Sequence, residues 1–424
     1  MDENWIKNFD ALATTNKRKL ALEIAEAGLD AINTEKVVSN SIKLENNILS
    51  VNGEDFDLTN FKRIKVVGFG KASCDAALAL EKILGQKIDE GIVIGLHKVT
   101  CEYIESFAGT HPRPSPGNVE VGKKIYDMMD KSDENDLIIA IVSGGGSALL
   151  CYPNSECDQG IELYDKIIKY KETITKMNTV RKHISILKGG GLAKIAYPAT
   201  IIGLIFSDVP GDNFDEVASG PTYKDKTTIN DALVIINEHN LGHFDLIETP
   251  KDDKYFEKVH NFVLVSNKTA VGAMERKAKE LGFKTNIVST ELYEEVGEAL
   301  EKIFGAQKDD TVILAAGEPE LEVTKKGGSG GRNLFMGLRA LKMKLVDDNS
   351  VFIPLASDGM DNSDSAGAVV DRNTLEKVGK LGLNLDDYID RFDAYPVFQK
   401  SGDMIMTGPT GANVSDLMIL LTKK

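Results

Sequence analysis

One pattern recurs along the sequence and constrains the fold more than any other feature. Short apolar runs rich in β-branched residues are each followed by a glycine-rich turn and then by a stretch with helical apolar spacing. This order is typical of a largely parallel sheet covered by helices, so we predict an α/β fold. The expected strands are 64–67, 91–94, 137–142, 200–206, 262–265, 311–315 and 351–355, and the clearest helices are 73–84 and 269–281.

The length of the chain predicts more than one domain. A chain of 424 residues exceeds what one ordinary hydrophobic core supports, and we expect two domains. The charged stretch 248–258, which contains Pro250, is the best candidate for a linker. We therefore predict an N-terminal domain of residues 1–247 and a C-terminal domain of residues 259–424. Residues 5–31 have helical spacing without glycine turns and are expected to form leading helices.

Composition and charge exclude several classes of partner. The formal net charge is −15, which argues against nucleic acid or an anionic membrane as a partner. No apolar run is long enough for a membrane span, and the N-terminus lacks a secretory signal. The four scattered cysteines show no zinc spacing, so a structural metal is not expected. We expect a cytoplasmic protein that binds small molecules.

Two glycine loops in the first half have the character of anion sites. The first contains Gly68, Gly70, Lys71 and Ser73, where free N–H groups, a helix N-terminus and a lysine all favour negative charge. It lacks the Walker spacing, so a tight turn with a solvated lysine explains it equally well. The second is Ser143-Gly144-Gly145-Gly146-Ser147, after the most apolar strand. Three consecutive glycines there favour a bound phosphate over a flexible turn.

Two further clusters carry charge. Arg181 and Ser185 share a helix face, with Lys188 one turn further on, and that face can hold an anion. Lys182 and His183 beside them can equally be solvated surface groups. Asp208 and Asp212 follow a buried strand, where carboxylates typically serve Mg²⁺ or act as general bases. Their alternative role is to cap a local turn.

Polar glycine loops also close the strands of the second half. The predicted binding residues there are Glu318, Gly330, Gly331, Arg332, Asn333 and Asp358. Asp361 lies in the same loop as Asp358, and a further polar segment runs from Thr407 to Asp416. Because ligand sites gather at the carboxyl edge of a sheet, we interpret these loops as parts of a site.

Taken together, these loops closely resemble the class II glycerate 2-kinases, whose C-terminal half is known as the MOFRL domain. The resemblance spans most of the chain in family order. It rests on the runs 68–73, 111–112, 143–149, 178–183, 188–190, 207–209, 218–222, 317–318, 331–333, 357–359 and 407–416.

The resemblance implies both a fold and an activity. It implies a larger Rossmann-like N-terminal domain, a smaller C-terminal α/β domain, and an active site in the cleft between them. It implies transfer of the γ-phosphoryl group of ATP to D-glycerate, giving 2-phosphoglycerate and ADP, with Lys71 and Arg332 as key residues. Asp208 is a further candidate catalytic residue, and Asp208 and Asp358 are candidate ligands of Mg²⁺. A homodimer is compatible with this assignment.

One position departs from the family pattern. The family often continues the histidine loop as HPVP, whereas this chain has His111-Pro112-Arg113-Pro114. Arg113 therefore introduces a charge beside the predicted site, and the sequence does not show what that charge contacts.

The sequence favours the kinase over two other functions. An NAD(P)-dependent hydroxypyruvate reductase would also need glycine loops, but Lys71 interrupts the dinucleotide pattern and the next strand ends near His97 and Lys98 rather than an acidic residue. A non-catalytic sugar-phosphate-binding protein would not need Asp208, Asp358 and Asp361 among its anion loops, because their negative charge weakens anion binding unless a metal intervenes.

Overall fold

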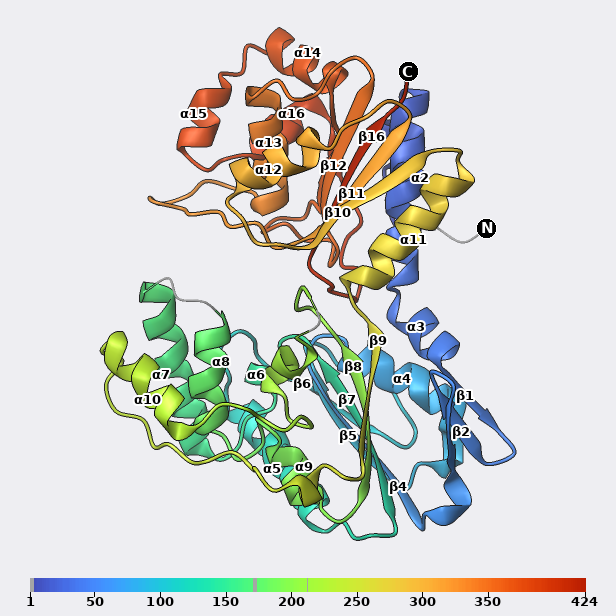
Figure 1. The fold of residues 1–424 in the computed structure, drawn as a ribbon, viewed down its shortest axis with the longest axis vertical. Helices are drawn as coiled ribbons and strands as arrows, with labels where there is room; N and C mark the ends of the chain where they lie inside the picture. Colours follow the sequence, from blue (N-terminus) through green and yellow to red (C-terminus); the bar gives the residue numbers. More distant parts are fainter. Residues whose placement is uncertain (1–3, 171–173, 212) are drawn as a thin grey trace. The chain divides into compact units, whose positions relative to one another are not determined.

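The computed structural model describes residues 4–170, 174–211 and 213–424, which form two compact units. One unit spans Thr34–Leu264, and the other joins the N-terminal segment up to Asn33 to Val265–Lys424. Both units mix helices and strands, so the predicted α/β class is confirmed (Figure 1).

The first unit is built on a six-stranded sheet of order β6-β5-β4-β7-β8-β9. Strands β6, β5, β4, β7 and β8 run parallel to their neighbours, which is the arrangement of a Rossmann-like sheet. The strands are β4 Arg63–Phe69, β5 Glu90–Gly95, β6 Glu105–Ala108, β7 Asp136–Ser143, β8 Thr200–Phe206 and β9 Val259–Val265. The chain runs outward from β4 to β6 and then returns to β7, so the direction of winding reverses between β4 and β7.

Helices cover both faces of this sheet (Figure 1). Alternate residues of β4 and β7 point to opposite faces, and the inner row packs on α5 and α9, whereas the other row meets α4. A smaller apolar cluster joins α7, α8 and α10. The helices of this unit are α3 Thr34–Ser41, α4 Ser73–Leu84, α5 Pro116–Asp130, α6 Gly146–Leu149, α7 Asn154–Tyr170, α8 Ile174–His183, α9 Gly191–Ala196 and α10 Ile229–Glu238.

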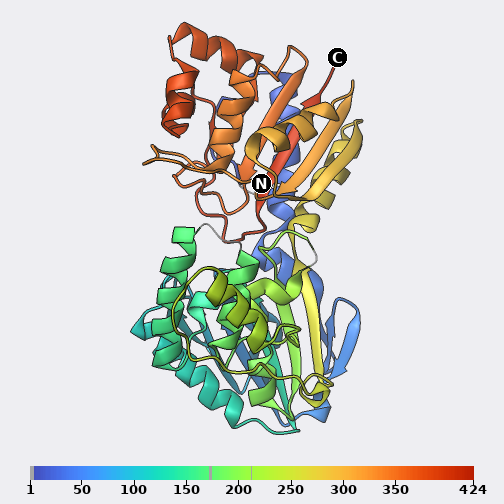
Figure 2. The same ribbon diagram turned by 60° about the vertical axis from the view of Figure 1, so that its left-hand side comes forward.

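A small antiparallel meander precedes the main sheet. Its strands are β1 Ile42–Glu45, β2 Ile48–Val51 and β3 Glu54–Asp57. Figure 2 shows the blue meander beside the yellow strand β9, where Phe56 packs edge-on against His260 and Phe262. The meander therefore covers the β9 edge of the sheet.

The second unit contains a mixed sheet of order β10-β11-β16-β12-β13-β15. The last strand, β16, lies antiparallel between β11 and β12, and β14 pairs with β12. Its strands are β10 Lys284–Leu292, β11 Thr311–Gly317, β12 Ser350–Ala356, β13 Gly367–Ala368, β14 Val370–Asp371, β15 Met404–Ile405 and β16 Asp416–Thr422. Its helices are α1 Phe9–Leu12, α2 Asn16–Ala31, α11 Asn267–Glu280, α12 Val296–Gly305, α13 Arg332–Lys342, α14 Arg372–Lys380, α15 Leu385–Asp390 and α16 Tyr395–Ser401.

These units differ from the predicted domain limits at two places. The leading helices pack with the C-terminal unit, because α2 lies on α11 and a β-carbon at Gly28 would stand 2.8 Å from Cγ of Met274. The predicted linker 248–258 belongs to the first unit, where Lys251 donates to the carbonyl of Asp225 at 3.0 Å. The chain leaves that unit after β9, because pairing with β8 makes this strand part of the first sheet.

Candidate functional site

The two predicted glycine loops of the first unit follow β4 and β7, where the winding of the sheet reverses. Ligands of open α/β sheets bind at the carboxyl ends of strands at such a point. The loops contact each other through the N–H of Lys71, which donates to the carbonyl of Gly144 at 2.8 Å. Gly70 has φ +124°, and a β-carbon there would stand 2.1 Å from Oγ of Ser143. This close packing requires glycine.

The serines at the start of these loops hold the turn. Ser143 accepts a hydrogen bond from the N–H of Ala72 at 3.1 Å. Ser73 is buried, and its hydroxyl lies 2.7 Å from the carbonyl of Ile94 and 2.8 Å from that of Gly70. Gly68 leaves room for Val93 and Ile141 under the loop. These predicted binding residues shape the backbone that would face a ligand.

Three polar side chains surround Gly144 and Gly145. Asp208 lies against Gly144, where a β-carbon would stand 1.9 Å from Oδ2 of Asp208. Lys71 and His111 flank Gly145, each near 3.1–3.2 Å from the place of its missing β-carbon. Within the described part of the chain, the Lys71 ammonium has no hydrogen-bond or ion-pair partner. A lysine and a carboxylate predicted from separate loops thus meet at one place.

The charges of these groups influence one another. Burial raises the pKa of Asp208, and the charge of Lys71 acts in the opposite direction. Burial lowers the pKa of His111 to about 4, and the positive charges of Lys71 and Arg181 add to this effect. The residue keeps solvent exposure, so this burial is partial, and His111 is neutral at pH 7.

A chain of hydrogen bonds links the second loop to α8. Ser147 and Ser219 share a hydrogen bond of 2.8 Å between their hydroxyls, and the Ser219 hydroxyl donates to Oδ1 of Asn178 at 3.1 Å. Asn178 also accepts from Arg181 at 3.0 Å. Ala218 and Ser219 have positive φ values of 51° and 60°, a conformation that costs energy in non-glycine residues and is enriched at functional sites.

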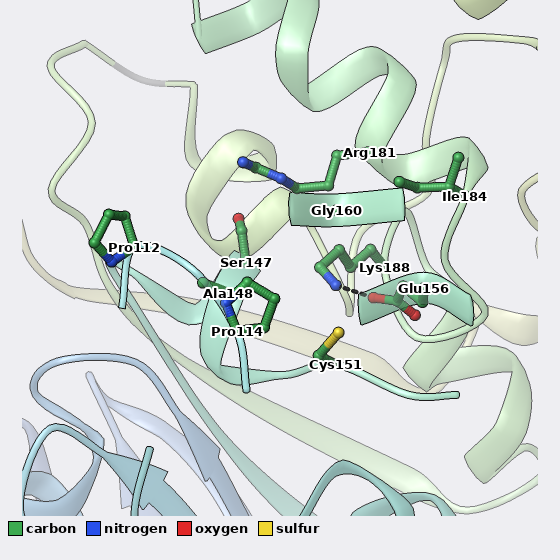
Figure 3. A pocket seen from close by; sticks show the side chains of 10 residues that line it. All are labelled: Pro112, Pro114, Ser147, Ala148, Cys151, Glu156, Gly160, Arg181, Ile184 and Lys188. Carbon is green, nitrogen blue, oxygen red and sulfur yellow. Dashed lines mark hydrogen bonds and ion pairs between the residues drawn. The ribbon is translucent and has the colours of Figure 1, made fainter. Parts of the chain in front are cut away.

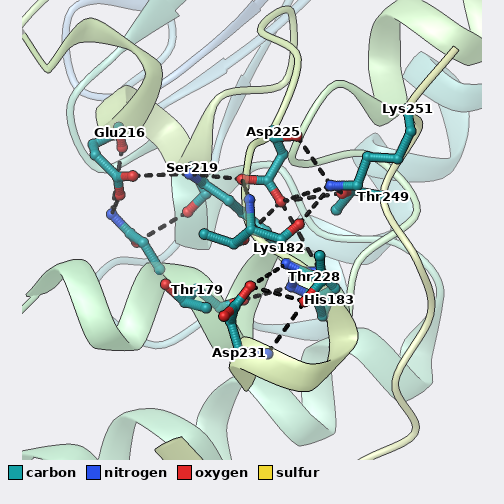
Figure 4. A network of polar contacts seen from close by, with 12 residues as sticks. Thr179, Lys182, His183, Glu216, Ser219, Asp225, Thr228, Asp231, Thr249 and Lys251 are labelled. Carbon is teal, nitrogen blue, oxygen red and sulfur yellow. Dashed lines mark hydrogen bonds and ion pairs between the residues drawn. The ribbon is translucent and has the colours of Figure 1, made fainter. Parts of the chain in front are cut away.

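Lys182 and His183 are buried in a polar network instead of being solvated (Figure 4). Lys182 bonds Glu216 at 2.8 Å and lies 3.4 Å from Asp225. Nδ1 of His183 lies 2.8 Å from the carbonyl of Thr179. The network holds the segment after β8 against α8, so its role is to support the fold of this region.

The charge of Arg113 is paired with a carboxylate on the surface. Its guanidinium bonds Asp165 at 2.5 and 2.9 Å and lies over the ring of Tyr164 at 5.4 Å. Both partners belong to α7, and the ion pair is exposed. The departure from the family pattern therefore adds a surface contact with α7.

In the second unit, strand register brings three predicted loops together. Asp416, the first residue of β16, pairs with both Gly317 and Ala356. Glu318 follows Gly317, and Asp358 lies two residues beyond Ala356, so these side chains share one edge of the sheet. Together with Arg332 they line an open pocket of about 530 Å³.

Arg332 in this pocket is flanked by two carboxylates. It donates to Asp416 at 2.6 Å and lies 3.7 Å from Glu318. Burial opposes the charge of Arg332, but these two carboxylates raise its pKa above the ordinary value. Its Nε atom is buried without a partner among the described residues. Arg332 is thus held charged at the edge of the pocket, with one donor still unsatisfied.

Asp361 caps the helix that begins at Arg332. Its carboxylate accepts from the backbone N–H groups of Gly331, Asn333 and Leu334 at 3.1, 3.0 and 2.7 Å. Asn333 donates from its side chain to Asp361 and Asp416 at 3.2 and 2.7 Å. Burial raises the pKa of Asp361 to about 6, and the charge of Asp416 adds to the effect. Gly331 is needed here because a β-carbon would stand 2.4 Å from this carboxylate.

The predicted site residues thus fall into two groups. Lys71, Asp208 and the loop 143–147 meet in the first unit, whereas Glu318, Arg332 and Asp358 meet in the second. Lys188 forms an ion pair with Glu156. Gly330 has φ +101° and lies in the turn before α13. Asp212 lies outside the described residues. The cleft predicted between the two domains stays a prediction.

Sequence reasoning did not assign site roles to His111, Asp416 or Asp361. His111 stood in a family motif, but only the fold places it beside Lys71. Asp416 was part of the last glycine-rich segment, and its role follows from the insertion of β16 between β11 and β12. In the sequence, Asp361 is only one of several carboxylates among the loops, and its capping role depends on the tertiary contact with α13.

Comparison with known proteins finds two family matches, one in each part of the chain. Residues 20–249 match a family described as a domain of unknown function, DUF4147, and residues 311–416 match the MOFRL family. A glycerate 2-kinase of Pyrococcus horikoshii is 32% identical, over 95% of this chain and 97% of the relative. The chain belongs to the MOFRL-type glycerate kinases. The resemblance drawn from the loops is therefore confirmed.

Other MOFRL-type relatives add structural and functional context. The crystal structure of a glycerate kinase from Thermotoga maritima superposes with a TM-score of 0.83 at 30% identity, covering 95% of this chain and 99% of that one. A relative in Agrobacterium vitis, 33% identical over 85% of this chain and 87% of its own length, carries the name putative hydroxypyruvate reductase. Family membership makes this chain a phosphotransferase that acts on an alcohol group, which excludes the non-catalytic binding protein.

Proposed function

We propose that this glycerate kinase transfers the γ-phosphoryl group of ATP to the 2-hydroxyl of D-glycerate, giving 2-phosphoglycerate and ADP. The observation that carries the proposal is the ammonium of Lys71, which has no partner among the described residues and lies at the switch point of the parallel sheet. Beside it lies the carboxylate of Asp208, whose pKa burial raises. Relatives from Pyrococcus horikoshii and Thermotoga maritima, named glycerate 2-kinase and D-glycerate 2-kinase, support the choice of acceptor and hydroxyl.

The residues divide the work of phosphoryl transfer. Such transfer depends on positioning and on positive charge around the moving group more than on covalent chemistry. Lys71 and Arg332 would offset the negative charge that develops on the phosphoryl oxygens. Asp208 would accept the proton of the attacking hydroxyl, a role favoured by burial, which raises its pKa. Free N–H groups of the loop 143–147 would orient the phosphates.

The donor chemistry suits magnesium as the metal. In the described ranges, no three histidine, cysteine, aspartate or glutamate side chains are arranged to hold a metal ion. Mg²⁺ takes one or two protein carboxylates and completes its shell with water and phosphate oxygens. We propose Asp358 for this role, and Asp208 either for this role or, as above, for that of the base. When bound to ATP, Mg²⁺ would neutralise part of the phosphate charge.

Direct assay of the products tests the proposal. Purified protein with ATP, Mg²⁺ and D-glycerate should form ADP and 2-phosphoglycerate in equal amounts, identified by ³¹P NMR. The competing activity is reduction of hydroxypyruvate with NADH or NADPH, as the name of the Agrobacterium vitis relative suggests. Consumption of NAD(P)H without any ADP from glycerate would overturn the kinase proposal.

Location and assembly stay predictions. Across the described residues, none of the helices combines the length and apolar character needed to cross a membrane. We keep the cytoplasm and a homodimer as proposals based on the sequence and the family resemblance. Fractionation of cells and light scattering of the purified protein would test them.

A further inference from the structure

A pocket of the Rossmann-like domain contains an arginine that forms no ion pair with any carboxylate of the described residues. The pocket lies between the loop after β6 and the helices α7 and α8, and it is partly open to solvent. Its polar lining includes Ser147, Arg181 and Lys188, whereas Pro112 and Ile184 contribute apolar surface. Figure 3 shows the Arg181 guanidinium extending over the hydroxyl of Ser147.

The two cations of the pocket differ in their partners. Lys188 forms a buried ion pair with Glu156 and donates to the carbonyl of Leu150 at 2.8 Å. Arg181 donates to Oδ1 of Asn178 at 3.0 Å and to the sulfur of Met177 at 2.7 Å, and both acceptors are neutral. Through the described ranges, Arg181 has no ion pair. Lys188 is therefore satisfied, whereas the charge of Arg181 is left for a ligand.

A charge of this kind favours an anionic ligand. Burial lowers the pKa of Arg181 to about 10, so it stays charged at neutral pH despite the cost of its desolvation. An anion in the pocket would relieve that cost. The planar guanidinium matches the two oxygens of a carboxylate, and a small pocket with apolar walls suits a short organic acid better than a nucleotide.

The location of Arg181 near the proposed reacting groups also supports the binding of an acid. Arg181 and Lys71 both act on the charge of His111, so the imidazole lies within the electrostatic range of both cations. Ser147, at the end of the glycine loop, also lines the pocket. An acid held by Arg181 would therefore lie next to the glycine loop 143–147, against which Lys71 and Asp208 also lie.

We propose that Arg181 binds the carboxylate of the acceptor acid, with the pocket of Ser147, Pro112 and Ile184 selecting a short 2-hydroxy acid. The inference rests on the proposed kinase function and names the residue that recognises its substrate. Lys71 would then interact with the phosphoryl group, and Arg181 would bind the carboxylate of the acceptor.

Steady-state kinetics and calorimetry of the full chain test the inference. Arg181→Gln should raise the KM for D-glycerate by about 10- to 100-fold, the scale of a lost charged hydrogen bond, and leave the KM for ATP within about 2-fold. Glyceramide, which lacks the carboxylate charge, should be a poor acceptor for the wild type. In Arg181→Gln, the ratio of kcat/KM for glycerate to kcat/KM for glyceramide should be smaller than in the wild type. Arg181→Lys keeps the positive charge but lacks the planar guanidinium, so its KM for D-glycerate should lie between those of the wild type and Arg181→Gln. Arg113→Gln is the matched control, since this nearby arginine pairs with Asp165 at the surface.

Each result bears on one claim. An unchanged KM for glycerate in Arg181→Gln, or a rise confined to ATP, would overturn the inference while leaving the kinase intact. Absence of phosphoryl transfer by the wild type would instead refute the proposed function. In that case calorimetric titration with D-glycerate alone still tests the binding site. Binding that is equally tight in Arg181→Gln and in the wild type would contradict the role of Arg181. If Arg181→Gln unfolds, the same titration with Arg181→Lys, checked by its thermal midpoint, replaces it.

Discussion

Gly144 and Asp208 are packed so closely that a β-carbon on the glycine would stand 1.9 Å from Oδ2 of the carboxylate. The contact joins the loop after β7 to the loop after β8, two segments more than sixty residues apart. It fixes the carboxylate against the backbone that we propose orients the phosphates.

Replacing Gly144 with alanine should therefore displace Asp208. We expect Gly144→Ala to lower kcat by roughly 10² or more, the scale for losing one preorganised group. Gly379→Ala is the control, because a β-carbon at this helical glycine would meet nothing within 4 Å. Turnover of Gly144→Ala close to wild type would show that the position of Asp208 is not important for catalysis.

Lys71 and Arg332 should act on one reacting group. Replacing either with alanine should lower kcat by roughly 10² to 10³, because each would stabilise charge that develops in the transition state. The double variant should lose less than the product of the two single losses. Lys62→Ala, at an exposed lysine before β4, should leave kcat unchanged. Independent, multiplicative losses would argue that the two residues serve different groups.

The N-terminal helix should contribute strongly to stability through Arg18. This side chain is 1% exposed and donates to Asp371 and Asp403 at 2.7 Å each. Arg18→Met would leave two buried carboxylates poorly compensated, so the free energy of unfolding should fall by about 3–5 kcal/mol in urea titrations at pH 7. Lys19→Met, at an exposed neighbour, should change it little.

The effect of Arg18 should also depend on pH. Burial alone would raise the pKa of Asp371, but hydrogen bonds and the charge of Arg18 hold it below the usual value. The folded pKa is thus depressed, so this stabilisation is complete above the ordinary value near 3.8 and is lost as the pH falls through the lower folded pKa. The difference between Arg18→Met and wild type should shrink on acidification. A difference that stays constant down to pH 3 would contradict this account.

His111 should titrate far below an ordinary histidine. Its ring resonances should follow a pKa of about 4 in NMR, and Lys71→Ala should move that pKa upward by removing a nearby positive charge. Because the folded pKa is depressed from 6.5, the unfolded chain binds the proton first, and stability should decline as the pH falls from about 6.5 to about 4. Solvent screening at this exposed residue keeps the decline small. A pKa near 6.5 in both proteins would show that the two cations do not act on His111.

The sequence by itself determined the local elements and the chemistry of the loops. Apolar periodicity predicted α4 as residues 73–84 and β8 as residues 200–206, both with the bounds that the structure has. Glycines next to charged residues identified the loops that contain Lys71 and Arg332, and three glycines between serines identified the loop that begins at Ser143. These features depend on neighbours within a few residues, so a linear pattern is enough to reveal them.

Only the tertiary structure decided which distant groups meet. The pairing of Arg332 with Asp416 depends on β16 lying between two strands that precede it in the chain. The helix that carries Arg18 joins the C-terminal unit because buried carboxylates more than 350 residues away hold its guanidinium. Lys188 and Arg181 look alike in the sequence, yet only the fold places Glu156 beside one of them. Burial and long-range charge neutralisation depend on three-dimensional proximity, which local spacing does not specify.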